Sequence, residues 1–205
     1  MGTRHLTMVI NNGETKVAQY GQWDGYLSCA GANVLNFLKK YNLEYFKEKL
    51  DKVSFYTNEE MKENWRIFAK SKGIDPEEKF VAYEIMEEYN VLYPELNRDV
   101  GTDILQMIID NDKILKLMDD SAFAKDSLFC EYAYVIDLDN NLFEVYKGFN
   151  KTPLTGKDRF FYLQKEDDEY KPVKLAVSFP LDNLPTKEEF VKFDEEDEED
   201  EEDEE

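Results

Sequence analysis

One short segment of this chain holds the densest set of side chains that could bind or convert a ligand. It runs Tyr20-Gly21-Gln22-Trp23-Asp24-Gly25-Tyr26. Its two glycines permit tight backbone turns, and they enclose an amide, an indole and a carboxylate between two phenols. Aromatic rings with a few polar groups are typical of small-ligand pockets. The candidate ligand-binding residues are therefore Arg4, Tyr20, Gln22, Trp23, Asp24 and Tyr26.

The same loop also has a structural interpretation. In it, Trp23 and Tyr26 fill the bottom of the core, and Asp24 caps a turn. Large aromatic side chains supply much of the buried area of a core. We favour this interpretation for Trp23, and we expect its ring to lie mostly buried against the start of the chain.

Cysteine–histidine catalysis would have to use His5, because the chain has one histidine. Cys29 or Cys130 would supply the nucleophile, and Asp24 would orient the imidazole. However, His5 lies within a predicted strand, and both cysteines have apolar neighbours, which is typical of structural thiols. We therefore treat His5, Cys29 and Asp24 as weak catalytic candidates.

An amide hydrolase of the N-terminal-nucleophile type is a related alternative. Such enzymes place a Cys, Ser or Thr at the free end of a strand, where the amine acts as base. The predicted opening strand suits this topology. Loss of Met1 would expose Gly2, which carries no nucleophile, and Thr3 would need a further cut.

The sequence predicts neither a metal site nor a cofactor. One histidine and two distant cysteines cannot form a structural zinc site. The run Asp137-x-Asp139-x-Asn141 begins like a calcium loop, but Leu142 and Gly148 stand where that loop needs Gly and Glu, so we interpret it as a hairpin turn. Neither a P-loop nor a GxGxxG motif is present.

The periodicity predicts two groups of strands around a central run of helices. The segments Thr3–Ile10 and Glu14–Tyr20 flank the turn signal Asn11-Asn12-Gly13 and form an N-terminal hairpin. Helices are predicted over about 30–41 with Ser28 as cap, from the Thr57/Glu60 capping box to Gly73, from Asp75-Pro76 through Tyr89, and from Thr102 through Ile109. Strands follow at Cys130–Leu138, Leu142–Lys147 and Lys174–Phe179, and a Thr186/Glu189 capping box begins a last short helix.

This order favours an α+β fold over a parallel doubly wound sheet. We expect one domain over residues 1–193, with the central helices packed on an antiparallel sheet built from the hairpin and the later strands. Residues 194–205 are all acidic, so they repel one another and contain nothing to bury. We expect this segment to be a disordered tail.

The charge limits the possible partners. The twelve tail residues account for 12 of the net charge of −21, which leaves −9 on the body. Negative charge disfavours direct binding of nucleic acid or of an anionic membrane, and it permits a basic protein surface. The predicted partner-binding residues are Asp194, Glu195, Glu196, Asp197, Glu198, Glu199 and Asp200. Two cysteines, with neither a signal peptide nor a long apolar run, indicate the cytoplasm.

Several stretches carry a resemblance to known proteins. They are Met1-Gly2-Thr3-Arg4, Lys16–Tyr26, Arg98-Asp99-Val100-Gly101, Cys130–Tyr134 and Glu144-Val145-Tyr146. Together they resemble a family of uncharacterised bacterial and phage proteins that begin with "MGTR" and carry "YGQWDGYP" near residue 25. Leu27 stands where that family has proline. The resemblance covers about residues 1–150 and implies a phage-linked origin without implying an activity.

Our leading hypothesis is an acidic protein-binding module. It would be a phage-encoded effector or inhibitor that engages a basic surface of a host or defence protein, with the tail mimicking nucleic acid. The alternative is a small-molecule-binding protein or an amide hydrolase with its site at residues 20–26.

Overall fold

The computed structural model describes residues 2–78 and 80–193. The polyacidic segment and its predicted partner-binding residues lie outside them. The strands are β1 (His5–Asn11), β2 (Glu14–Gly21), β3 (Val53–Phe55), β4 (Leu115–Leu117), β5 (Tyr132–Asp137), β6 (Leu142–Lys147) and β7 (Lys174–Pro180). The helices are α1 (Ala32–Lys40), α2 (Leu43–Leu50), α3 (Asn58–Ser71), α4 (Tyr83–Leu92) and α5 (Ile104–Asp110), and residues 187–193 are also helical.

The main sheet has the strand order β2-β1-β5-β6-β7. Its neighbouring pairs are antiparallel except β1 and β5, which run parallel. The predicted N-terminal hairpin and C-terminal strands are both confirmed, and so is the α+β class. The parallel pair joins these two groups at the centre of the sheet, where both faces are covered.

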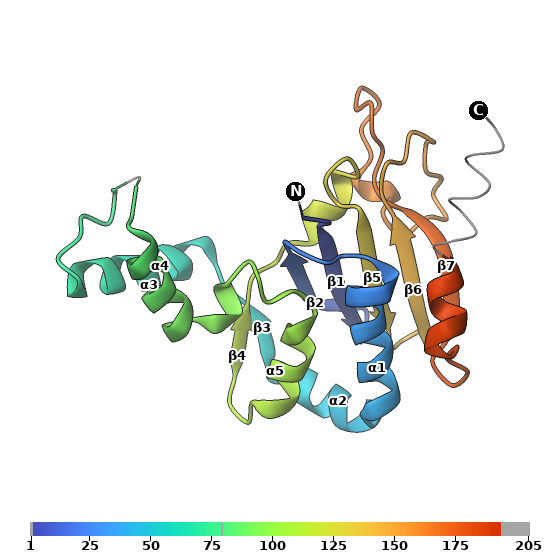
Figure 1. Cartoon of the computed structure of the whole chain (residues 1–205), viewed down its shortest axis with the longest axis horizontal. Coiled ribbons are helices and arrows are strands. Elements are labelled where there is room, and N and C mark those ends of the chain that lie inside the picture. Colours follow the sequence, from blue (N-terminus) through green and yellow to red (C-terminus); the bar gives the residue numbers. More distant parts are fainter. Residues whose placement is uncertain (1, 79, 194–205) are drawn as a thin grey trace.

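Side chains alternate between two cores across this sheet. Val9 and Ile136 belong to the core under α1, α2, α5 and residues 187–193, and we call this side the helix-covered face. Leu6 and Val135 belong to the core on the opposite face, which is covered by short turns and loops. Figure 1 shows α1, α2 and α5 in front of the strands.

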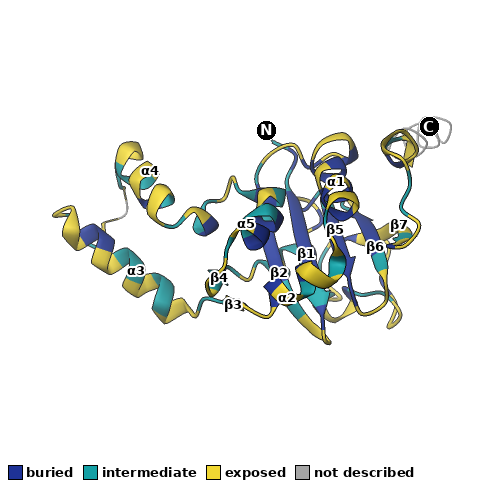
Figure 2. Cartoon of the chain, turned by 90° about the horizontal axis from the view of Figure 1, so that it is seen from below, coloured by how far each residue is buried: buried dark blue, intermediate teal, exposed yellow. Residues whose placement is uncertain are grey.

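Helices α3 and α4 depart from the prediction that the central helices pack on the sheet. They extend away from it as a pair, which we call the arm, residues 57–92 (Figures 1 and 2). The arm has its own small aromatic core, in which the Trp65 ring lies 5.9 Å from Phe68 and 5.4 Å from Tyr89. At its base, the Tyr56 hydroxyl donates a hydrogen bond to Glu95 Oε1 at 2.9 Å.

Two predicted capping boxes are confirmed. The Thr57 hydroxyl accepts from the Glu60 amide at 3.2 Å, and the Glu60 carboxylate accepts from the Thr57 amide at 2.9 Å. Thr186 and Glu189 make the same reciprocal pair, at 3.2 and 2.7 Å. In both boxes the partners are three residues apart, so local sequence is sufficient to specify them.

Three other predicted helix caps are wrong. Ser28 lies inside the π-helical turn Leu27–Gly31, and α1 begins only at Ala32 without a side-chain cap. The Asp75 carboxylate instead accepts from the Glu77 amide at 3.0 Å, which closes a local turn, and α4 starts at Tyr83. Thr102 lies within a 3₁₀ turn, Gly101–Asp103, and makes no capping bond to α5.

Candidate functional site

The loop that follows β2 lies against the residues that precede β1 and against β5. The Gly25 amide donates to the Thr3 carbonyl at 2.9 Å, and the Tyr134 hydroxyl donates to the Gly25 carbonyl at 2.5 Å. Gly25 itself is buried, and a Cβ there would lie 2.9 Å from the Thr3 oxygen. A side chain at this position would therefore push the loop away from β1.

Trp23 is half exposed, at 49%, so the expectation of a mostly buried ring is wrong. Its ring covers Gly2, where a Cβ would lie 2.1 Å from the indole. Its Nε1 donates to Asp99 Oδ1 at 2.9 Å, and Arg98 Nε lies 3.6 Å from the same oxygen. The polar edge of the indole thus holds it at the surface, where it joins residues 20–26 to residues 98–101.

Tyr20 and Gln22 are paired with each other. The Tyr20 hydroxyl donates to Gln22 Oε1 at 2.6 Å, and the Tyr20 ring lies 4.9 Å from Phe123 in an edge-on arrangement. The Tyr20 amide donates to Asp120 Oδ2 at 3.0 Å. Burial raises the pKa of both the Tyr20 phenol and the Asp120 carboxyl. These contacts fix the end of β2 and leave the polar atoms of Tyr20 engaged.

Arg4 and Tyr26 lie apart from that pair. The Arg4 guanidinium stacks over the Phe129 ring at 4.5 Å, and the Arg4 amide donates to Glu131 Oε1 at 3.2 Å. Tyr26 is about half exposed, and its ring centroid lies 6.2 Å from that of Tyr132. The six predicted ligand-binding residues therefore lie around one corner of the sheet. The hollows beside Arg159, Asn36 and Lys125, and the one between α3 and α4, are lined by other residues.

His5 is buried on the helix-covered face, between glycines. A Cβ on Gly21 would lie 2.2 Å from the His5 Cε1 atom, and one on Gly101 would lie 3.1 Å from Nε2. Tyr134 meets the imidazole edge-on at 6.2 Å. Within the described residues, neither ring nitrogen has a hydrogen-bond partner. Desolvation lowers the pKa of His5 from 6.5 to about 4, so the ring is neutral near pH 7.

His5 is part of a small buried polar cluster. Thr7 and Gln19 are register partners on β1 and β2, and they lie on the same face as His5 and Gly21. The Thr7 hydroxyl and the Gln19 Oε1 atom are also buried without a hydrogen-bond partner among the described residues. Each such group costs about 1–3 kcal/mol of stability. The side chains of His5, Thr7 and Gln19 therefore lower the stability of the fold at this place.

The weak catalytic candidates do not assemble. Cys29 is exposed, and its sulfur lies 3.8 Å from the Ser28 hydroxyl. Asp24 is exposed too, with a left-handed backbone (φ 54°). Cys130 is buried, desolvation raises its pKa, and its thiol donates to the Tyr132 carbonyl at 3.4 Å. Since the described contacts of His5 include no hydrogen bond, the nucleophile–base pair that this chemistry needs is not formed.

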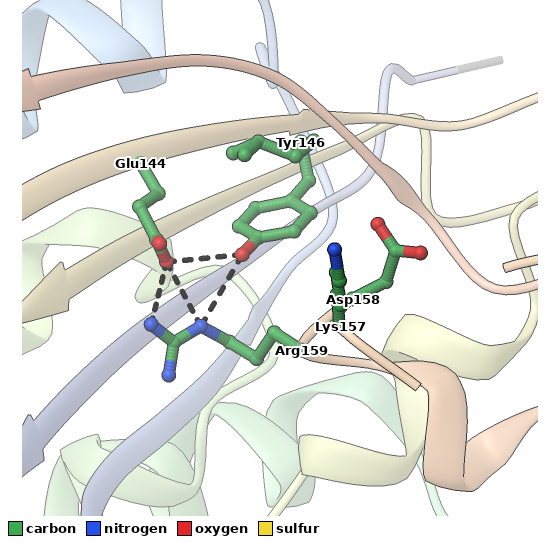
Figure 3. Close-up of a pocket in the computed structure, with 6 residues that line it drawn as sticks. Glu144, Tyr146, Lys157, Asp158 and Arg159 are labelled. Atoms are coloured by element: carbon green, nitrogen blue, oxygen red, sulfur yellow. Dashed lines mark hydrogen bonds and ion pairs between the residues drawn. The ribbon is translucent and has the colours of Figure 1, made fainter. Parts of the chain in front are cut away.

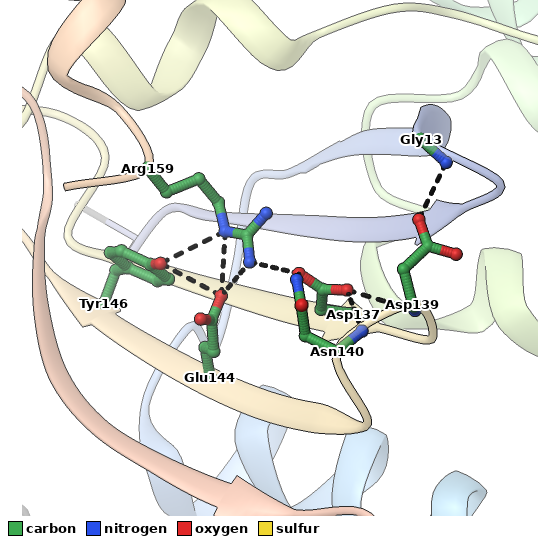
Figure 4. A network of polar contacts seen from close by, with 7 residues as sticks. All are labelled: Gly13, Asp137, Asp139, Asn140, Glu144, Tyr146 and Arg159. Atoms are coloured by element: carbon green, nitrogen blue, oxygen red, sulfur yellow. Dashed lines mark hydrogen bonds and ion pairs between the residues drawn. The ribbon is translucent and has the colours of Figure 1, made fainter. Parts of the chain in front are cut away.

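A second polar site, which the sequence did not predict, lies on the opposite face of the sheet. Arg159 reaches from a loop to carboxylates on β5 and β6 (Figure 4). Its Nη2 atom lies 2.5 Å from Asp137 Oδ2 and 2.8 Å from Glu144 Oε2. The Tyr146 hydroxyl donates to the same Glu144 oxygen at 3.0 Å. One sequence signal was available, because Glu144 interrupts the hydrophobic run from Leu142 to Tyr146.

Hydrogen bonds stabilise the charged form of Asp137 in this network. Burial alone would raise the pKa of Asp137, but hydrogen bonds from Asn140 and Arg159 lower it. Burial raises the pKa of Tyr146. An open depression of about 400 Å³ adjoins the network, with Lys157 and Asp158 at its rim (Figure 3). Because each of these side chains is bonded to another, the network holds the loop of Arg159 on the sheet.

The predicted hairpin turn at residues 137–141 is present. Asp137 Oδ1 accepts from the amides of Asp139 and Asn140 at 3.1 and 2.9 Å. Asp139 in turn accepts from the amide of Asn12 at 2.8 Å. It also accepts from the amide of Gly13 at 2.7 Å (Figure 4). These carboxylates join the tips of two hairpins. Within residues 2–78 and 80–193, no three His, Cys, Asp or Glu side chains are grouped so that they could hold a metal ion.

The arm carries a third feature, an open groove of about 660 Å³. Phe68 and Lys72 of α3 line one side, and Glu84, Glu87, Val91 and Leu92 of α4 line the other. Lys72 pairs with Glu88 across it. The groove is therefore acidic toward the start of α4 and apolar toward its end.

None of the helices in the described part of the chain is both long and apolar enough to span a bilayer. In comparisons with known proteins, no family model, curated protein or solved structure matches this chain.

Proposed function

We propose that this chain is an acidic protein-binding module that engages a partner through its arm. The observation that carries this proposal is the exposure of large apolar side chains on a segment that extends away from the body. Five of them have exposed fractions between 57% and 90%: Ile67, Phe80, Tyr83, Val91 and Leu92. Val91 and Leu92 line one groove, and exposed apolar patches of this kind mark interaction surfaces.

The charge of the arm supports a basic partner. Helix α4 carries Glu84, Glu87 and Glu88 and has neither Lys nor Arg. The whole chain carries −21, so like-charge repulsion opposes self-association through this surface. Complementary charge accelerates encounter and fixes the register of a complex.

The tail adds a long-range component to this proposal. Its acidic residues, Asp194 to Asp200 among them, would attract the same basic surface over a Debye length of about 8 Å. The resemblance to phage proteins supports an effector that acts on a host or defence protein in the host cytoplasm. The tail would then imitate the negative charge of nucleic acid without binding nucleic acid itself.

The test is site-specific photo-crosslinking in the native host. A photoreactive residue at Val91 should capture one discrete protein, whereas the same residue at exposed Tyr162 on the body should not. The captured protein is then purified, and its association rate is measured over a salt series. We expect association to slow as salt rises, and to slow further when residues 194–205 are replaced by an uncharged Gly/Ser segment. Equal capture at Val91 and Tyr162, or rates independent of salt, would refute the proposal.

A small-molecule-binding function has one observation in its favour. Trp23 and Tyr26 are each about half exposed at the same corner of the sheet, where their rings could stack on a planar ligand. Trp23 fluorescence in a Trp65→Phe variant, screened against aromatic metabolites, would detect such binding. The hydrolase form of this alternative has no support from the contacts of His5.

A further inference from the structure

The two ends of the groove on the arm differ in chemical character. Glu84 and Val91 are seven residues apart on α4, so at 1.5 Å per residue the acidic and apolar ends lie about 10 Å apart along the helix. The apolar end is formed by Val91 and Leu92 beside the buried ring of Phe68. A ligand that fills the groove must therefore be apolar at one end and cationic at the other.

The acidic end is available for a new ion pair. Glu88 is already paired with Lys72. Glu87 accepts a hydrogen bond from the Tyr83 hydroxyl at 2.7 Å, but it makes no ion pair within the described residues. Glu84 has neither a hydrogen bond nor an ion pair from its side chain in that part of the chain. Two carboxylates therefore face solvent beside an exposed apolar patch.

We infer that the occupant of this groove is a basic amphipathic helix of the partner protein. It would place an apolar side chain against Phe68 and Val91, and a Lys or Arg two helical turns away against Glu84. Seven residues of the partner helix also span about 10 Å, so the spacing of its two side chains matches the spacing of the two ends of the groove. Helix-in-groove recognition uses apolar anchors at this kind of spacing. This inference rests on the proposed function and specifies the partner's recognition element.

A second copy of this chain fits the groove less well. Helix α3 of a second copy would bring Lys62, Arg66 and Lys70, but it carries as many glutamates, and two chains of charge −21 repel each other. Strand addition also fails, because the arm consists of helices and turns and offers no strand edge among its described residues. A basic helix satisfies both ends of the groove at once.

The test uses purified full-length protein and a synthetic probe. The probe is a fluorescently labelled helical peptide with leucines on one face and lysines two turns further along. The control peptide has the same composition in shuffled order. Fluorescence anisotropy should show saturable binding of the patterned peptide, with at least roughly tenfold weaker binding of the shuffled one.

Matched variants locate the binding. Val91→Asp and Glu84→Lys should each weaken binding by roughly tenfold. Asp182→Lys makes the same charge change at an exposed site on the body and should leave affinity nearly unchanged. All three positions are exposed, so unchanged thermal unfolding will confirm that the variants fold. If the shuffled peptide binds equally well, or if Glu84→Lys and Asp182→Lys weaken binding equally, the inference is wrong.

One outcome separates this inference from the proposed function. The peptide should compete with the protein that is crosslinked at Val91. If that protein is captured at Val91 but the patterned peptide neither binds nor competes, the arm still binds a partner and the basic helix is refuted. If the peptide binds and competes, both conclusions stand.

Discussion

Acidification should destabilise the fold through His5. Burial holds its pKa at about 4 in the folded state, against 6.5 for an exposed imidazole. Above pH 6.5 both states are neutral there, and this group has no effect on stability. Between pH 6.5 and about 4 the unfolded chain binds a proton that the folded chain rejects, so stability falls. At 1.36 kcal/mol per pKa unit, the loss is about 3 kcal/mol.

The assay compares urea unfolding of the native chain with that of His5→Gln from neutral pH down to about pH 4. Carboxylates titrate in both proteins, so their contribution cancels when the two pH profiles are subtracted. The difference in unfolding free energy should shift by about 3 kcal/mol in favour of the variant as the pH falls. The absolute stability of the variant does not matter, because only the pH dependence is compared.

An NMR titration provides an independent reading. The chain has one histidine, so one imidazole signal reports it without assignment. In the folded protein this signal should not move until the pH approaches 4. A midpoint near 6.5 in the folded state, or identical pH profiles for the native and His5→Gln proteins, would refute the reasoning.

Three further predictions concern the stability of the fold. Gly21→Ala should cost about 1–3 kcal/mol, measured by thermal unfolding, because the new Cβ would lie 2.2 Å from the His5 ring; His5→Ala in the same chain should remove that clash. Arg159→Met should cost about 3–5 kcal/mol in urea at neutral pH, and less in acid, because it leaves two buried carboxylates without their cation. Trp23→Ala should cost only about 2 kcal/mol in the same assay, because half of the ring is already exposed.

The features that sequence predicted well are local ones. The N-terminal hairpin follows from β-forming segments around Asn11-Asn12-Gly13, and Asn12 and Gly13 adopt the left-handed backbone that such a turn needs. The Thr57 and Thr186 capping boxes each depend on residues three apart. In these cases the interaction partner is visible in the sequence itself.

The features that sequence missed depend on distant partners. Arg159 lies 22 residues from Asp137 and contacts it only because a loop crosses the sheet. Trp23 stays at the surface because Asp99, 76 residues away, accepts its indole hydrogen. Asp75-Pro76 has the pattern of a helix start, but the Asp75 carboxylate instead closes a turn with Glu77. The sequence shows which hydrogen bonds a side chain can form. Tertiary contacts decide which of these bonds it forms in the fold.

The bond between Tyr56 and Glu95 makes the arm a separable module. Lys116 of β4 adds an ion pair to Glu60 of the arm, so the arm is an insertion that is anchored at its base to an otherwise continuous sheet protein. A Gly/Ser bridge could replace residues 57–92, because closing a loop between two segments that a side-chain bond already holds together costs little entropy. The body could then carry a different arm while its two cores stay unchanged.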